Sequence, residues 1–545
     1  MTTDGMTPRA EVRGSAVEGA AYLNEGKRQE ASVPPLDQSA SKARVDEILN
    51  RWPAVGLAVG VVRDGSPEAF HGQGFADIAS KEPITKDTVF RIASISKTFT
   101  AIAVMQLWEQ GLVDLDAPAN TYLRAYKLIP AKASWRPATV RHLLTHTAGV
   151  PEWVRPSRMV KSGWFGESFA LDEPLPSLAE YYRGGLRLAA EPGTVWAYTD
   201  HGFATLGQIV EDVSGLPLHR YLREHIFKPL GMDSSDLLRS ERVQAQLATG
   251  YRLTSKGAKP LTDRQGVTQA AGSIYSTPRD MARYVAALLS GGSGEHGAIL
   301  KPETQAMMFE PHYQPDPRIP GMGLGFWRVD LGGHPAVEHQ GVVAGFNSQI
   351  FLAPNDGVGV IAFTNGARNA LAATWLMGET QRLLGDLIGA PADGIPTDIP
   401  QHPEIWGDLC GWYHPRAQRT DLQAWSMLGA GVQVLVRRGQ LMLRALSPIP
   451  ALYRGLRLHP GDKHDPYVFL IDLSPYGIDT ARVVFSRDAA GAATGVHLDG
   501  ILLSAEKRPA SRDPRRWATG AAGVLAAATA VRAVRRTRSK PYKDL

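Results

Sequence analysis

Ser94 and Lys97 stand three positions apart at the head of a long apolar segment. A serine hydroxyl is a weak nucleophile at neutral pH, and it needs an adjacent base and preorganised donors for the oxyanion. Residues three apart on a helix share one face, so Lys97 can take the serine proton if a sheltered pocket keeps it neutral. The pair predicts a covalent acyl-transfer site with Ser94 as nucleophile and Lys97 as base.

The same spacing also occurs at Ser39–Lys42 and Ser504–Lys507. Ser39 lies in a polar N-terminal arm, and Ser504 lies at the end of a strand-rich region. Only Ser94 lies between an extended segment, 88–92, and an apolar helix predicted to end at Gly111. There its N–H belongs to the first turn, where unpaired donors and the helix dipole favour a developing oxyanion.

Five sequence blocks follow one another around this pair: TVFRIASISKTFTAIAVMQL, VRHLLTHTAGVPEW, PGTVWAYTDHGFATLGQIVEDVSG, GSIYSTPRDMARY and VEHQGVVAGFNS. In the same order, they resemble blocks of the serine β-lactamase-like hydrolases. They fall within about residues 43–387 and resemble the branch of class C β-lactamases, D-alanyl-D-alanine carboxypeptidases and carboxylesterases. The resemblance implies an α+β fold, with a β-lactamase-like antiparallel sheet flanked by helices, a largely helical lobe, and the active site between them.

The resemblance also implies roles for residues in two further motifs. In such enzymes the second motif is Tyr-x-Asn, and Tyr198 matches its tyrosine, which would help to move the proton from Ser94 to the leaving group. The third motif is Lys-Ser/Thr-Gly or His-x-Gly, and His339 and Gly341 match the latter form. The N–H groups of Ser94 and Val342 would then form the oxyanion hole.

The chain departs from the family pattern at Asp200, where the second motif has asparagine. An asparagine amide both donates and accepts hydrogen bonds, whereas an ionised aspartate only accepts. A carboxylate near Lys97 also favours the charged lysine and so opposes its role as a base. Binding of an amide-bearing substrate should therefore suffer, and the sequence favours a carboxylesterase that acts on small esters.

Two other functions remain open. The first is a β-lactamase or D-alanyl-D-alanine carboxypeptidase, although those substrates lie outside the cytoplasmic membrane. The second is a catalytically inactive relative that binds or scaffolds another molecule, with Asp200 as a sign of lost activity.

Three further patterns do not change this interpretation. Tyr22–Asn24 and Lys161–Gly163 match the second and third motifs literally, but both lie before Tyr198 and out of the family order. His142 and His146 are four apart, but no glutamate completes a zinc motif there. We therefore expect no metal and no organic cofactor.

Composition along the chain predicts several parts. These are a disordered arm (1–40), the hydrolase domain (41–388), a proline-rich linker (389–405), a small all-β C-terminal domain (406–508) and a basic, alanine-rich tail (509–545). Within the hydrolase domain we expect a helix over 43–52, a strand and hairpin from Gly56, strands over 338–366 and a helix over 371–387.

The net charge of +5 comes from the tail, where nine lysines and arginines face two acidic residues from position 512 onward. The chain before this tail therefore gives no reason to expect a nucleic-acid partner. The tail allows only weak contact with a membrane surface, because its uncharged run, 517–531, is shorter than a spanning helix. The single cysteine, Cys410, excludes an internal disulfide, and the polar start without a signal peptide predicts a cytoplasmic protein.

Overall fold

The computed structural model describes residues 38–512, except 53, 156, 159–166, 368–373, 392–393, 419, 446, 448 and 501. Most of the arm predicted to be disordered and nearly all of the basic tail lie outside the described residues. The two literal motif matches, Tyr22–Asn24 and Lys161–Gly163, lie outside them too. Within the described part of the chain, every helix is too short or too polar to cross a bilayer.

Among the described residues, seven antiparallel strands form the central sheet, and strands from the two ends of the hydrolase domain meet inside it. The spatial order is β14 (Trp327–Asp330), β15 (Pro335–Val343), β16 (Phe346–Ala353), β17 (Val358–Thr364), β1 (Gly56–Arg63), β2 (Ser66–Asp77) and β3 (Glu82–Pro83). Leu57 of β1 lies opposite Thr364 of β17. The turn between β16 and β17, η4 (Pro354–Asp356), is closed by Gly357 at φ 69°, a conformation that glycine adopts readily. The hairpins predicted from Gly56 and over 338–366 are confirmed, and β14 adds a strand that the sequence did not indicate.

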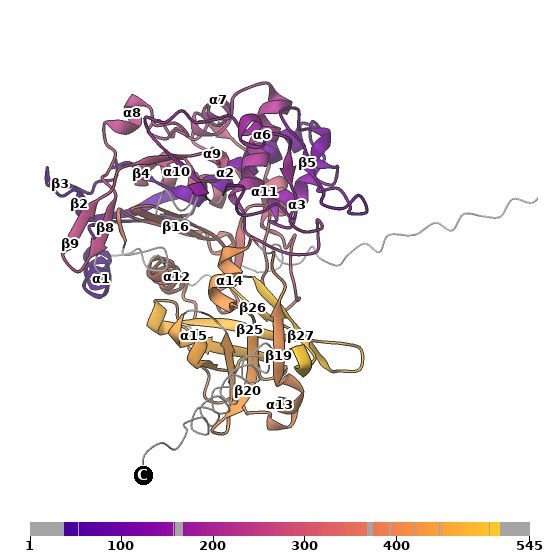
Figure 1. The fold of residues 1–545 in the computed structure, drawn as a ribbon. Helices are drawn as coiled ribbons and strands as arrows, with labels where there is room; N and C mark the ends of the chain where they lie inside the picture. Colours follow the sequence, from indigo (N-terminus) through magenta and orange to yellow (C-terminus); the bar gives the residue numbers. More distant parts are fainter. Residues whose placement is uncertain are drawn as a thin grey trace, which may run out of the picture.

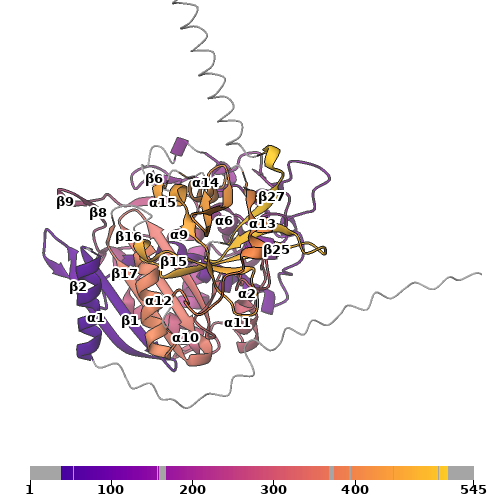
Figure 2. The same ribbon diagram turned by 90° about the horizontal axis from the view of Figure 1, so that it is seen from below.

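The sheet is covered on both faces, which explains why β1 is an unbroken apolar run. Leu57, Val59 and Val61 pack on the face covered by α1 (Gln38–Arg51) and α12 (Thr374–Ile388). Ala58 and Val62 point to the opposite face and join the main core, where α10 (Pro278–Leu289) contacts β1. In Figure 1, α1 and α12 lie below the sheet and α10 and α2 above it; Figure 2 shows α1 and α12 from below.

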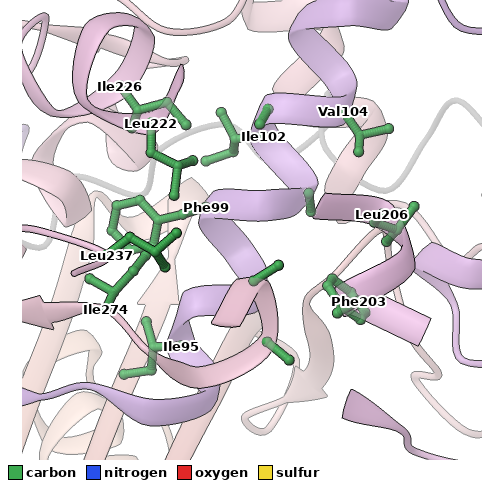
Figure 3. Packing of buried hydrophobic residues seen from close by; sticks show 14 of the residues in the cluster. Ile95, Phe99, Ile102, Val104, Phe203, Leu206, Leu222, Ile226, Leu237 and Ile274 are labelled. Carbon is green, nitrogen blue, oxygen red and sulfur yellow. The ribbon is translucent and has the colours of Figure 1, made fainter. Parts of the chain in front are cut away.

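Helix α2 (Ser96–Glu109) runs through the middle of the helical lobe and is buried from Ser96 to Leu107. It packs against α6 (Asp200–Ser214), α7 (Leu218–Leu222) and α9 (Gln269–Gly272). Figure 3 shows Phe99 and Ile102 of α2 beside Leu222 and Ile226, with Phe203 and Leu206 of α6 on another side. A helix enclosed in this way is apolar on all faces.

The other helical segments of this domain are η1 (Ala93–Ile95), η2 (Ala119–Thr121), α3 (Val140–Leu144), α5 (Leu178–Tyr181), η3 (Arg223–Phe227), α8 (Glu241–Gln244) and α11 (Pro302–Phe309). Short strands pair outside the main sheet: β4 (Phe90–Arg91), β5 (Leu128–Ile129), β6 (Ser168–Ala170), β7 (Leu186–Arg187), β8 (Tyr251–Thr254), β9 (Gly257–Pro260), β10 (Arg264–Gly266), β11 (Tyr275–Ser276), β12 (Ser293–Gly294), β13 (Gly297–Ala298) and β18 (Gly366–Ala367).

The C-terminal domain is a curled antiparallel sheet. Its spatial order is β22 (Leu456–Arg457), β21 (Gln440–Ala445), β20 (Val432–Arg437), β19 (Gly411–Pro415), β27 (Leu503–Arg508), β26 (Ala493–Leu498), β25 (Thr480–Arg487), β24 (Val468–Asp472) and β23 (His459–Pro460). The two outermost strands, β22 and β23, follow one another in the chain, so the sheet closes into a barrel-like shape. The hairpin between β20 and β21 turns at Arg438 and Gly439, both of which have positive φ.

Short helical segments accompany these strands: α13 (Pro403–Leu409), α14 (Leu422–Leu428), α15 (Pro450–Arg454), η6 (Ser474–Tyr476) and η7 (Ala510–Arg512). The predicted fold class is confirmed, since a helix-flanked antiparallel sheet is followed by a β domain. Helix α13 begins at Pro403, inside the range that the sequence predicts as a linker.

The C-terminal domain packs directly on the hydrolase domain, as Figure 1 shows below α12. Thr374 of α12 donates to the carbonyl of Tyr476 (2.7 Å), and Arg382 forms an ion pair with Asp479 (2.8 Å). Gly378 permits the closest approach, because a Cβ atom there would lie 1.7 Å from the carbonyl oxygen of Gly477.

We expect Gly378→Ala to destabilise the protein by about 1–3 kcal/mol, because its methyl group must push the two domains apart. Gly385→Ala is the matched control on the same helix, since its Cβ would meet only the Cβ of Ala390 at 3.8 Å. The control should be neutral or stabilising by up to about 1 kcal/mol through helix propensity. Thermal unfolding of both variants measures the difference, and equal midpoints would contradict the packing described here.

Candidate active site

Ser94 lies in the single turn η1, between strand β4 and the start of α2. The residue before it, Ala93, has φ +47°, a left-handed conformation that is costly for a side chain other than glycine. This turn leads directly into α2, so Lys97 comes back toward the serine, and its Nζ donates to Ser94 Oγ at 3.1 Å. The structure therefore brings together the two residues that the sequence paired. Ser504, in contrast, lies in strand β27 of the C-terminal domain.

Lys97 is fully buried, and three of the acceptors around its ammonium group come from three different elements. Besides Ser94 Oγ, Nζ donates to Asp200 Oδ1 at 2.6 Å and to the carbonyl oxygen of Ala271 at 3.0 Å. Burial by itself would lower the pKa of Lys97, but the Asp200 carboxylate and the Tyr198 hydroxyl outweigh burial and raise it above its ordinary value. Lys97 is therefore an ammonium in the resting site, which is the effect expected of Asp200.

Asp200 takes this position because it is the first residue of α6. Its carboxylate lies at the N-terminus of that helix, where the macrodipole favours a negative charge. The side chain is 41% exposed, whereas Lys97 is 0% exposed. The ion pair with Asp200 thus joins the buried lysine to a side chain that reaches solvent.

Tyr198 lies over Lys97, with Nζ 4.6 Å from the centre of its ring. Its backbone is held on both sides by His146: Ala197 N donates to the His146 carbonyl (2.9 Å), and Thr199 N donates to His146 Nδ1 (3.2 Å). Burial raises the pKa of Tyr198, against the opposing effects of Lys97 and of hydrogen bonds with Lys97 and Ser94. The phenol therefore keeps its proton and lies where it can pass one between the serine side and the lysine.

The third motif lies on β15, whose edge faces the nucleophile. Among the described strands, β14 pairs with β15 only from Pro335 to Glu338, so the stretch from His339 to Val343 has β16 on one side and no strand on the other. Gly341 lets this stretch approach closely, because a Cβ there would lie 2.1 Å from the carbonyl oxygen of Ile92. Ser348 Oγ fixes the same carbonyl with a 2.7 Å hydrogen bond.

Val342 and Ser94 consequently line one cavity. His339 is fully buried, and burial, with a smaller effect of Lys97, lowers its pKa to about 3, so the ring is neutral. Its Nδ1 lies 2.7 Å from the carbonyl oxygen of Gln340, and its Nε2 has no hydrogen-bond partner among the described residues. The catalytic roles of Tyr198, His339, Gly341 and Val342 stay predictions.

Sequence reasoning missed two groups of this site, His146 and the carbonyl of Ala271. His146 was considered only as a metal ligand with His142; instead His142 caps α3 through Thr139, and His146 has φ +56° and supports Tyr198. No three histidine, cysteine or carboxylate side chains gather into a metal-binding group in the part of the chain that the structure describes. The left-handed backbone of His146 and the carbonyl on α9 depend on the assembled fold and leave no signal in the sequence.

The cavity beside Ser94 has a volume of about 260 Å³. Its charged lining residues are Arg91, Glu167, Asp200, Arg239, Asp263 and Arg264. Arg91 donates to Asp263 at 2.8 Å, Lys97 pairs with Asp200, and Glu167 accepts from Tyr181 at 2.7 Å and lies 3.0 Å from His201. The cavity is thus polar, and its acids are already paired inside the protein.

Comparison with known sequences agrees with the family resemblance of the five sequence blocks. The family model described as Beta-lactamase matches residues 43–380. A β-lactamase from Yersinia enterocolitica is 27% identical over 330 residues, which cover 60% of this chain and 76% of that protein. Esterase EstB from Burkholderia gladioli is 30% identical over 287 residues, which cover 49% of this chain and 71% of the esterase.

Comparison with solved structures extends the likeness of fold beyond the matched family region. The octameric penicillin-binding protein homologue from Pyrococcus abyssi has a TM-score of 0.55 and 23% sequence identity, and the match covers 86% of this chain and 100% of that chain. The resemblance found in the five sequence blocks is therefore confirmed by sequence and by fold. The chain belongs to the beta-lactamase family.

Proposed function

We propose that this protein is a serine hydrolase that acts through an acyl-enzyme on Ser94 and prefers small carboxylic esters. The observation that carries the proposal is the 3.1 Å contact between Ser94 Oγ and the buried Nζ of Lys97, next to a cavity that the serine lines. The placement of Tyr198 and of the β15 edge beside this pair supports it.

In the proposed reaction, Ser94 Oγ attacks the substrate carbonyl as its proton passes to Lys97 in the neutral form. The N–H groups of Ser94 and Val342 stabilise the oxyanion. The C–O bond to the leaving group then breaks, and the proton returns from Lys97 through Tyr198 to the departing alkoxide. Water attacks the acyl-enzyme in the same way, which releases the acid and restores Ser94.

The ion pair between Lys97 and Asp200 supports a preference for esters. Because Lys97 is charged at rest, its reactive neutral form is a minor fraction at neutral pH. An alkoxide leaves more easily than an amide nitrogen, so an ester tolerates a site in which the neutral form of the base is scarce. The similarity to Esterase EstB is in line with this choice.

A β-lactamase or D-alanyl-D-alanine carboxypeptidase is the second candidate, and relatives named β-lactamase and penicillin-binding protein favour it. The third candidate, an inactive binding protein, agrees with a resting site in which the base is already protonated.

Assays of the purified protein on short p-nitrophenyl esters and on a chromogenic cephalosporin separate the three candidates. We expect ester turnover in the wild type and its loss by at least about a thousandfold in Ser94→Ala, because the nucleophile is removed. A fluorophosphonate probe should label the wild type at Ser94 and leave Ser94→Ala unlabelled. Cephalosporin turnover without ester turnover would reject the esterase, and a wild type that neither reacts nor takes up the probe would favour the inactive protein.

Replacement of Asp200 tests the role of the ion pair. Since the carboxylate is the main group that raises the pKa of Lys97, Asp200→Asn should let burial lower that pKa. The acid limb of kcat/KM for esters should then move to lower pH by about one unit or more, with a rise of about tenfold or more at the foot of the limb. Asp263→Asn is the control, because Asp263 lines the same cavity but pairs with Arg91. An acid limb that stays in place in Asp200→Asn would contradict Lys97 as the base.

A further inference from the structure

An apolar cluster of side chains from both domains lies next to Tyr198. The hydrolase domain contributes Trp196, Ile319, Met322 and Trp327, and the barrel contributes Val468, Val484 and Leu502. Each of these side chains is at most 5% exposed, and Tyr198 packs against them.

The barrel side of this cluster faces outward from the barrel. Along β25, Val483 and Phe485 belong to the barrel core, whereas Val484 between them belongs to the shared cluster. Val484 lies opposite Val468 of β24, so the two valines form one apolar patch on the outer wall. Side chains alternate between the two faces of a strand, and this patch would be exposed to water if the hydrolase domain did not cover it.

Hydrogen bonds of two arginines join the two domains beside this apolar centre. Arg318, on the segment that carries Ile319, donates to Asp465 (2.8 Å) and to the carbonyl oxygen of Phe485 (2.9 Å) on the barrel. A further hydrogen bond has its donor on the barrel, because Arg482 of β25 donates to the carbonyl oxygen of Arg318 (3.1 Å). The segment that leads to β14 is therefore held to the barrel at several points.

On the other side, the same segment touches the nucleophile helix. Gly325 donates to the carbonyl oxygen of Leu144 (3.2 Å), and a Cβ on Gly325 would lie 2.7 Å from the Cβ of Ala101 in α2. The segment is thus enclosed between the barrel and the helix that carries Lys97.

Within the cluster, aromatic rings connect the barrel wall to the tyrosine. The rings of Trp196 and Trp327 meet edge to face at 5.2 Å, and the rings of Tyr198 and Trp327 are stacked with centroids 6.4 Å apart. The His146 ring contacts Tyr198 at 4.4 Å. Protein interiors are close-packed, so a void beside Trp327 lets this set of rings shift.

We propose that the C-terminal barrel contributes to the active site by positioning Tyr198. The outer valines of the barrel hold Trp327 and Trp196 against Tyr198, and this packing fixes the phenol between Ser94 and Lys97. Trp327 is in this sense a positioning residue, because it acts through Tyr198. The inference rests on the proposed function, in which Tyr198 transfers a proton, and a misplacement of about 1 Å in such a group costs about a hundredfold in rate.

Two neighbouring valines give a matched test. Val484→Ala opens space in the shared cluster, and Val483→Ala opens the same space in the barrel core; both side chains are 0% exposed. Both variants should lower the thermal midpoint. For p-nitrophenyl ester turnover in the full chain, Val484→Ala should lose about three- to tenfold in kcat with KM unchanged, and Val483→Ala should keep the wild-type kcat.

Two substitutions of Trp327 provide a second test. Trp327→Leu fills much of the space without a ring and should lose about tenfold or more in kcat, whereas Trp327→Phe keeps a ring and should stay within about threefold of the wild type. The inference is overturned if Val484→Ala loses no more kcat than Val483→Ala, or if Trp327→Leu and Trp327→Phe are equally active. A wild type without Ser94-dependent turnover would instead reject the proposed function, and this inference with it.

Discussion

The buried ammonium of Lys97 is the constraint on which the site depends. A charged group out of contact with water is stable only where hydrogen bonds and an opposite charge replace its hydration. Here the replacements come from three segments distant in sequence: the turn of Ser94, the first residue of α6 and the carbonyl of Ala271 on α9. Helices α2, α6 and α9 must pack in one arrangement for these acceptors to converge, so the apolar lobe around α2 and the chemistry of the site are specified together.

The same constraint explains the importance of Asp200. An amide at this position would accept one hydrogen bond from Lys97 and leave burial to lower the lysine pKa. The carboxylate instead raises that pKa and ties the lysine to the N-terminus of α6. One departure from the family motif therefore bears directly on the protonation state of the resting site. The site gains a stable ion pair and holds its base in the protonated form at rest, and this is the basis of the proposed preference for esters.

Much of this could be predicted from the sequence where the signal is local. The apolar run of β1, the turn at Pro354–Asp356 and the helix after Ser94 each carry their own pattern, and the Ser94–Lys97 contact follows from helical spacing. The site residues matched by family motifs also lie around the serine. The shared cluster could not be predicted in this way, because Val483 and Val484 are both apolar, and β25 therefore shows no period-two pattern. Only the assembled fold reveals that one faces the barrel core and the other the hydrolase domain. His146 was missed for a similar reason, since its hydrogen bonds with Ala197 and Thr199 join segments about fifty residues apart.

The charged residues that line the cavity beside Ser94 bear on the choice of substrate in the proposed function. Three arginines and three acids line it, and the contacts within the protein already occupy much of their hydrogen-bonding capacity. Asp263 binds Arg91 and Tyr275, Arg264 donates to Ser168, and Glu167 accepts from Tyr181. A lining with balanced charges attracts neither anions nor cations strongly. In the proposed function, shape and individual hydrogen bonds would therefore select the acyl group, while Ser94, Lys97 and the edge of β15 would provide the reaction centre. The relatives of this chain carry esterase, β-lactamase and penicillin-binding protein names, so membership of one family is compatible with different substrates.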